Sequence, residues 1–130
     1  MGPVNWLAVV LAAFIAVAIG IVWYGPLFRT GRPLLPGNSQ PTGNYALVIL
    51  IMLIGSTMLG HNFARIGSAT LDAKPWLYFM QSGGIAIAFI IPSLWLMLLR
   101  MGSSLSQRLI ESGYWLVAYL AMGATFLVLG

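Results

Sequence analysis

The sequence predicts an all-α integral membrane protein, a bundle of four transmembrane helices. Of its 130 residues, 60% are hydrophobic and 6% are charged, whereas a soluble domain devotes about a quarter of its residues to Asp, Glu, Lys and Arg. Four apolar stretches each supply the roughly 20 residues that a helix needs to cross the hydrocarbon core. Two acidic and six basic residues cannot cover a surface that faces water. This composition excludes a soluble enzyme and a nucleic-acid-binding protein.

We expect one membrane domain over residues 1–130, with helices at about 4–24, 45–64, 76–99 and 109–129. In the first stretch the one strongly polar side chain is Asn5, at the edge. The second stretch is apolar until His61 and Asn62, and the third contains Gln81 near its start. The fourth has Glu111 in its expected first turn. Polar side chains near helix ends can reach the lipid headgroups, so none of them argues against a membrane span.

The connections between the helices differ in character. Residues 25–44 contain four of the seven prolines and four glycines, a density of helix breakers that predicts a polar loop outside the hydrocarbon. The connection 100–108 is short, so the third and fourth helices should form a hairpin. Pro92 lies inside the third helix and removes a backbone hydrogen bond, which predicts a kink.

The basic residues predict the orientation, since short cytoplasmic loops are enriched in Lys and Arg. The loops 25–44 and 100–108 lie on one side of the membrane and contain Arg29, Arg32, Arg100 and Arg108. The opposite side has Arg65 and Lys74. We therefore expect loops 25–44 and 100–108 in the cytoplasm and both termini outside.

Small side chains recur at four-residue spacing on each of the helices. They are Ala8, Ala12, Ala16 and Gly20 in the first helix, Ser56, Gly60 and Ala64 in the second, Gly84 and Ala88 in the third, and Gly113, Ala121 and Thr125 in the fourth. This spacing forms a stripe along which another backbone can approach closely. We expect the stripes to pack the bundle internally; the alternative is a docking surface for a partner protein or a second copy.

Glu111 follows Arg108 by three residues, so both side chains lie on one helix face. An ion pair at the membrane interface would explain the carboxylate. The alternative is a proton-coupled carboxylate, because ionisable groups inside a membrane are usually functional.

His61 is the only histidine. A membrane histidine can ligate a haem iron, or the magnesium of a pigment. We expect instead that His61 caps its helix at the interface, where Asn62 and Gln81 can hydrogen-bond with it between helices. No catalytic constellation, metal site or cofactor site is predicted, because the chain has too few His, Asp and Glu residues and no Cys.

Two sequence runs resemble a known family. One is Trp23-Tyr24-Gly25-Pro26-Leu27-Phe28, preceded by Val4-Asn5-Trp6-Leu7-Ala8-Val9, and the other is Ile110-Glu111-Ser112-Gly113-Tyr114-Trp115-Leu116, followed by Met122-Gly123-Ala124. They resemble the start and the last helix of the bacterial membrane protein family named domain of unknown function 1761. The resemblance implies a small four-helix protein of the bacterial inner membrane, and it implies no activity.

We expect a small non-catalytic membrane protein, an accessory or scaffolding subunit that packs against a larger membrane complex. Its expected partners are lipids and either other membrane subunits or a second copy. The alternative is a minimal homodimeric transporter or channel. Small four-helix exporters resemble this chain in size, but they place a carboxylate in the middle of the first helix, where this chain has Ala13, Phe14 and Ile15.

Overall fold

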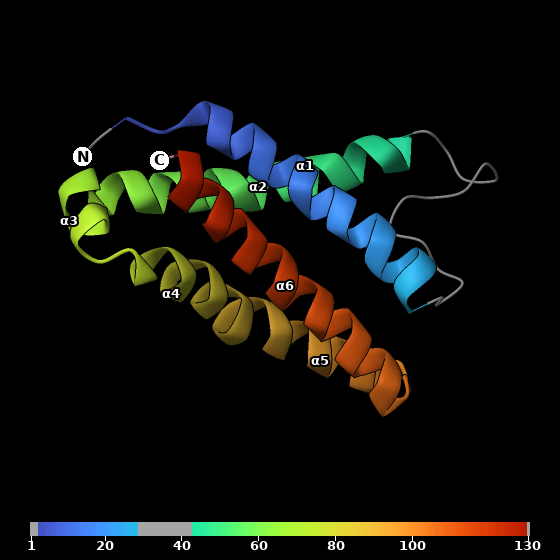
Figure 1. Ribbon diagram of the computed structural model, residues 1–130. Helices are drawn as coiled ribbons and strands as arrows, with labels where there is room; N and C mark the ends of the chain where they lie inside the picture. The colour runs from blue at the N-terminus through green and yellow to red at the C-terminus, as the bar shows by residue number, and fades with distance from the viewer. Residues whose placement is uncertain (1–2, 29–42, 130) are drawn as a thin grey trace.

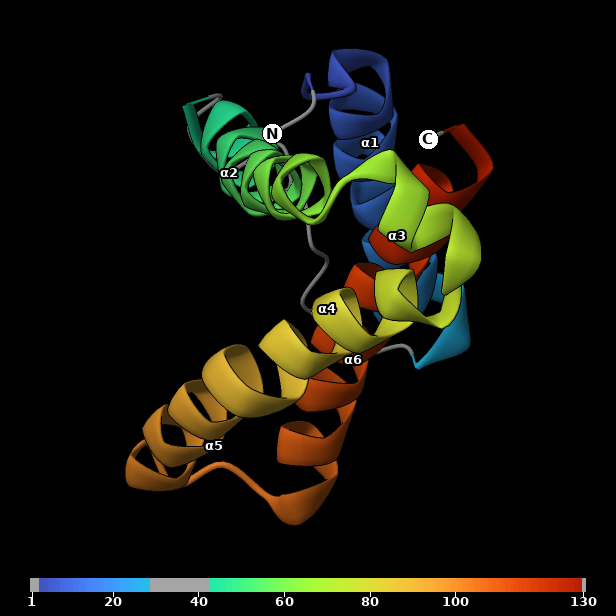
Figure 2. The same ribbon diagram turned by 90° about the vertical axis from the view of Figure 1, so that its left-hand side faces the viewer.

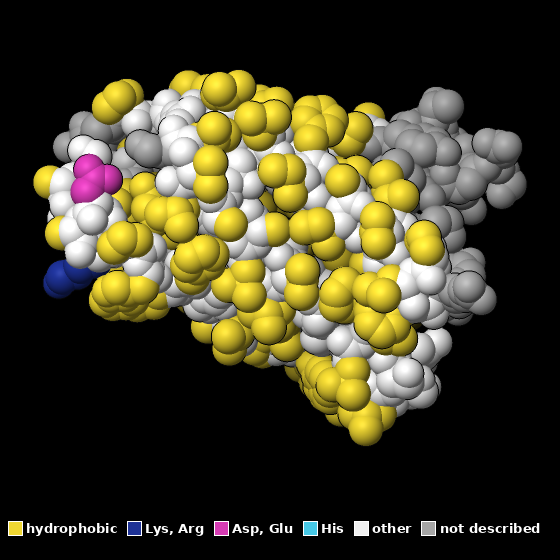
Figure 3. Space-filling model, in the orientation of Figure 1, with side chains coloured by type: hydrophobic (Ala, Val, Ile, Leu, Met, Phe, Trp, Pro, Cys, Tyr) yellow, Lys and Arg dark blue, Asp and Glu magenta, His cyan; other side chains and the backbone are white. Residues whose placement is uncertain are grey.

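The computed structural model describes residues 3–28 and 43–129, and these form helices and short connections without any strand. Four helical spans in this part of the chain are long and apolar enough to cross a membrane: Trp6–Leu27, Ala46–Ile66, Trp76–Arg100 and Leu105–Leu129. The predicted fold class is therefore confirmed. Side chains on the face shown in Figure 3 are mostly hydrophobic, and the charged groups visible there lie at the end formed by α3.

The elements, in chain order, are α1 (Trp6–Val22), η1 (Trp23–Leu27), α2 (Gly43–Ile66), α3 (Ser68–Ala73), α4 (Trp76–Ile85), η2 (Ala86–Ile90), α5 (Ile91–Arg100) and α6 (Leu105–Leu129). The central pair is α1 and α6, which cross each other; α2 packs on α1, and α4 packs on α6 (Figure 1). In Figure 2, α2 and α5 diverge from each other. Among the described residues, the packing of the bundle is therefore centred on α1 and α6.

The small residues of α1 face the inside of the protein. Ala8, Ala12 and Ala16 are fully buried, and Gly20 is also buried. Bulky residues of α1 face outward, among them Leu7 and Phe14 with exposed fractions of 64% and 51%. This stripe is covered by α2 and α6 and leaves no open surface for a partner.

The stripe of α2 packs against α1. The hydroxyl of Ser56 is fully buried and donates a hydrogen bond of 2.5 Å to the carbonyl oxygen of Val9. At Gly60 an added Cβ would lie 2.9 Å from Cγ2 of Val9, so glycine is what permits this approach. Ala64 is half-buried at the end of the stripe.

Among the described residues, two π-helical segments occur at prolines: η1 forms the end of the first span, and η2 interrupts the third. In η1, which contains Pro26, the N–H of Phe28 donates to the carbonyl of Trp23 five residues earlier. In η2, the N–H of Ile91 donates in the same way to Ala86, just before Pro92. Proline lacks an N–H and its ring collides with the carbonyl four residues before it. A wider turn next to the proline moves the backbone away from this collision. The expected irregularity thus lies upstream of Pro92 and not at it.

The fourth helix begins four residues earlier than expected. Ser104 and Gln107 form a capping box, in which the Gln107 N–H donates to Oγ of Ser104 and the Ser104 N–H donates to Oε1 of Gln107. Gly102 precedes it with φ of 76° and ends α5. Glu111 and Ser112 therefore lie in the second turn of α6, and not in its first.

The connection between the second and third spans contains the short helix α3, which the sequence analysis did not predict. Gly67, with φ of 93°, separates α3 from α2. Most of the expected loop 25–44 lies outside the described residues, but Gly25 to Leu27 belong to η1 and Gly43 begins α2.

Gly123→Ala tests the packing of α4 on α6. An added Cβ would meet Oγ of Ser82 and lie 2.8 Å from the carbonyl oxygen of Tyr78. We expect overpacking to cost roughly 1–3 kcal/mol of unfolding free energy, measured by denaturation in detergent micelles. Gly84→Ala is the control, because nothing lies within 4 Å of its Cβ position and alanine is a better helix former by about 1 kcal/mol. Equal losses from both variants would contradict this packing.

Candidate functional site

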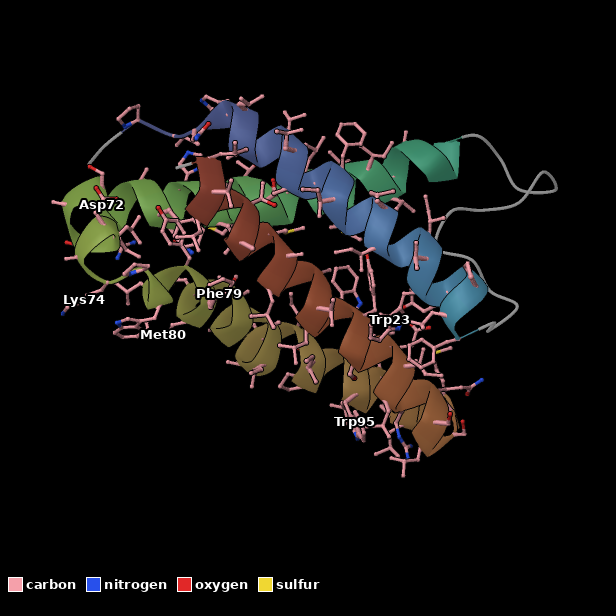
Figure 4. All side chains as sticks on the ribbon, in the orientation of Figure 1. Trp23, Asp72, Lys74, Phe79, Met80 and Trp95 are labelled. Carbon is pink, nitrogen blue, oxygen red and sulfur yellow. The ribbon has the colours of Figure 1, made fainter. Side chains whose placement is uncertain are left out.

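The end of the first span meets the start of the fourth in a set of polar and aromatic contacts. Nε1 of Trp23 donates a hydrogen bond of 3.0 Å to the carbonyl of Ile110. The hydroxyl of Tyr24 donates a 2.5 Å hydrogen bond to Oε2 of Glu111. In Figure 4 the side chain of Trp23 lies between the end of the first span and α6. We name Trp23, Tyr24, Ile110, Glu111 and Tyr114 the tyrosine–glutamate cluster.

Tyr114 anchors this cluster to the interior of the bundle. Its side chain is fully buried, and its hydroxyl donates a hydrogen bond of 2.8 Å to the carbonyl of Ala16. The rings of Tyr24 and Tyr114 lie 5.3 Å apart between centroids. Gly113 permits the contact with Trp23, because an added Cβ would lie 3.0 Å from Cζ2 of that ring. These contacts join the end of the first span to α6, although the paired residues are 87 or more positions apart in the sequence.

The expected ion pair between Arg108 and Glu111 does not form. Arg108 is directed elsewhere: its Nη1 donates to the carbonyl of Ser103 at 3.3 Å, and its guanidinium lies 5.4 Å from the centroid of the Trp95 ring. Glu111 pairs with Tyr24 instead. Helical spacing puts the two charges on one face, but Arg108 instead contacts the preceding turn and the Trp95 ring of α5, and Glu111 contacts Tyr24 of η1.

The membrane end that contains His61 forms no polar network of the kind we expected. His61 is exposed; its Nδ1 lies 2.9 Å from the carbonyl oxygen of Thr57 in its own helix, and its ring packs edge-on against Trp6. Asn62 and Gln81 are half-buried, and no hydrogen bond joins them to His61 among the described residues. A ligand role for His61, the weaker alternative, stays untested. Within the described residues, no three His, Cys, Asp or Glu side chains are grouped to hold a metal ion.

The structure also shows the surroundings of two further polar residues, Asn5 and Ser112, which the sequence analysis did not predict. Asn5 caps α1 by accepting a hydrogen bond from the N–H of Ala8, and its Nδ2 donates to the carbonyl of Leu129 at 3.0 Å. An asparagine just before an apolar helix is a recognisable N-cap signal. The hydrogen bond from Asn5 to Leu129 of α6 is a tertiary contact, which the sequence does not indicate. Ser112 is buried, and its hydroxyl has no hydrogen-bond partner.

A comparison with protein-family models matches residues 7–127 to the family described as protein of unknown function (DUF1761). The chain belongs to this family. No curated protein and no solved structure is detectably similar to it. The family DUF1761 was the one suggested by the runs around Trp23 and Glu111, and in the structure these two runs are the ones that meet in the tyrosine–glutamate cluster.

Tyr24→Phe, Glu111→Ala and the double variant test whether the cluster joins the two spans. We expect Tyr24→Phe to cost about 1–2 kcal/mol of unfolding free energy, because a hydrogen bond to a carboxylate is lost while the ring remains. The loss should be much smaller in the Glu111→Ala background, and this coupling is measured as a double-mutant cycle in detergent.

Ser112→Ala is the matched control for this cycle. It removes a buried hydroxyl that has no partner, so unfolding free energy should be unchanged or slightly higher. Additive effects of the Tyr24 and Glu111 variants would show that the two side chains do not interact.

Proposed function

We propose that this DUF1761 protein is a non-catalytic accessory or scaffolding subunit that packs against a transmembrane helix of a larger membrane assembly. The observation that supports the proposal is the uncovered third span. Of the 18-residue apolar stretch taken from each span, 17% is buried inside the protein in the third span, against 44% in α6 and 39% in the first span. In this span Gly84 and Ala88 are exposed one turn apart, and small residues at that spacing allow another helix to approach closely.

The divergence of α2 and α5 also supports an external partner. Among the described residues, α2 packs mainly on α1 and α5 on η2 and α6, and the two helices diverge from each other (Figure 2). Lipid can solvate such faces, but helices in membranes associate through close packing, which an uncovered face with small residues favours.

A minimal homodimeric transporter is the second candidate, and Glu111 is the observation that favours it. The carboxylate lies six residues after Leu105, about 9 Å along the helix axis, and within the fourth apolar span. An ionisable group at such a position is a functional candidate by default. Transport by the purified, reconstituted protein that depends on Glu111 would favour this candidate over the accessory role.

For the location we propose the bacterial inner membrane, with the α5–α6 turn in the cytoplasm and α3 outside. Four spans put the turn and α3 at opposite ends of the bundle (Figure 1). Arg100 and Arg108 lie at the turn, whereas Arg65 and Lys74 flank α3. Arg29 and Arg32, which also favour this orientation, lie outside the described residues.

Single cysteines test the accessory role, because the natural chain has none. We expect Ala88→Cys, treated in native membranes with a thiol-reactive photocrosslinker, to link reproducibly to one larger membrane protein identified by mass spectrometry. Phe14→Cys is the control, since Phe14 is 51% exposed on α1, away from the third span. A disulfide between two copies at Ala88→Cys would favour the homodimer. Equal crosslinking from both positions would contradict the proposal.

Cysteine labelling also tests the orientation. Met101, 71% exposed, lies at the α5–α6 turn, and Ala73 is exposed in α3. With a membrane-impermeant maleimide added to spheroplasts, Ala73→Cys should be labelled at once and Met101→Cys only after permeabilisation. The reverse pattern would invert the proposed topology.

A further inference from the structure

A cavity of about 350 Å³ lies beside the tyrosine–glutamate cluster, between η1, the end of α5 and the start of α6. Its apolar wall includes Phe28, Leu98, Met101 and Ile110. This volume is at the lower end of the range for small-molecule sites, which typically combine an apolar wall with a few placed polar groups.

Most of the polar lining of this cavity is already engaged within the protein. Oγ of Ser103 donates to the carbonyl of Leu98 at 2.8 Å, and the carbonyl of Ser103 accepts from Arg108. Oε1 of Gln107 accepts from the N–H of Ser104 in the capping box. These groups shape the cavity, and the side-chain nitrogen of Gln107 is a hydrogen-bond donor, which cannot bind a cation.

Glu111 is the lining residue that has a carboxylate. Tyr24 binds Oε2, whereas Oε1 accepts no hydrogen bond from the described residues, and the side chain lines the cavity. Its nearest basic neighbour in the sequence, Arg108, is held by the Ser103 carbonyl and the Trp95 ring. Among the described residues, no Lys or Arg lies within ion-pair distance of this carboxylate, which faces the cavity.

We propose that this cavity binds an organic ammonium group attached to a short apolar body. The ammonium would lie at Oε1 of Glu111, and the apolar part would lie against Phe28, Leu98 and Met101. A carboxylate in a partly desolvated cavity attracts a cation more strongly than in water, and the bond from Tyr24 holds it in one orientation. The ammonium can belong to a free amine or to an amino-lipid headgroup. The inference requires neither the accessory role nor transport.

Calorimetric titration of the purified protein in maltoside micelles tests the site, with hexyltrimethylammonium and hexylammonium as probes. We expect saturable binding with one probe per chain, and binding of the neutral isostere hexanol at least tenfold weaker. Glu111→Gln, which keeps an acceptor for Tyr24, should weaken the binding of the cations at least tenfold, equivalent to about 1.4 kcal/mol.

Asp72→Asn is the matched control. It changes the net charge by the same amount, but Asp72 lies on α3, at the opposite end of the bundle from Trp23 and Trp95 (Figure 4), and it should leave the affinity unchanged. Leu98→Trp, which fills the cavity while keeping Glu111, should also weaken binding. No saturable binding by the natural chain, equal effects of the two charge variants, or equal affinity for hexanol would each overturn the proposal.

Competition distinguishes the two sources of the ammonium group. Displacement of hexyltrimethylammonium by lysophosphatidylethanolamine, and not by lysophosphatidylglycerol, would identify an amino-lipid headgroup as the ligand. A site that binds the probes and ignores both lysolipids would be one for a free amine.

Discussion

The structure depends on the close approach of α2 and α6 to the backbone of α1. In a membrane, helices gain little from the hydrophobic effect when they pack together, because lipid tails are as apolar as their side chains. Packing must then come from dispersion contacts and hydrogen bonds at short range. The fully buried alanines of α1 allow the neighbouring helices to come this close. The hydroxyls of Ser56 and Tyr114 therefore reach the α1 carbonyls of Val9 and Ala16.

The same approach determines where the chain has its chemistry. Tyr114 fixes α6 against α1, and η1 then lies beside the first turns of α6, with Tyr24 at Glu111. The chain has two acidic residues; Asp72 is exposed in α3, so Glu111 is the one that lies in a membrane span. A carboxylate that the bundle orients, and that forms no ion pair with the described residues, is the feature most open to functional study in this DUF1761 protein.

Much of the fold was predictable because each span is long and apolar enough to be recognised without its neighbours. The stripe of small residues and the irregular third helix were also recognisable, because four-residue spacing and Pro92 are features of a single helix. Two local predictions were wrong, the first residue of the fourth helix and the partner of Glu111, because contacts between side chains decide both. The start of α6 depended on the Ser104–Gln107 capping box, a signal present in the sequence but outweighed by hydropathy. The Arg108–Glu111 pair had suitable helical spacing, but each side chain found a partner outside that spacing.

The sequence by itself determined the environment, the number of spans and the family, since composition and helix length are properties of single segments. Only the tertiary structure decided which polar groups meet. Trp23 and Tyr24 lie 87 residues from Ile110 and Glu111, and no periodicity within either helix relates them. Their meeting depends on how α1 and α6 cross, and that crossing follows from side-chain volumes along the whole contact. The cavity beside Glu111 has the same origin.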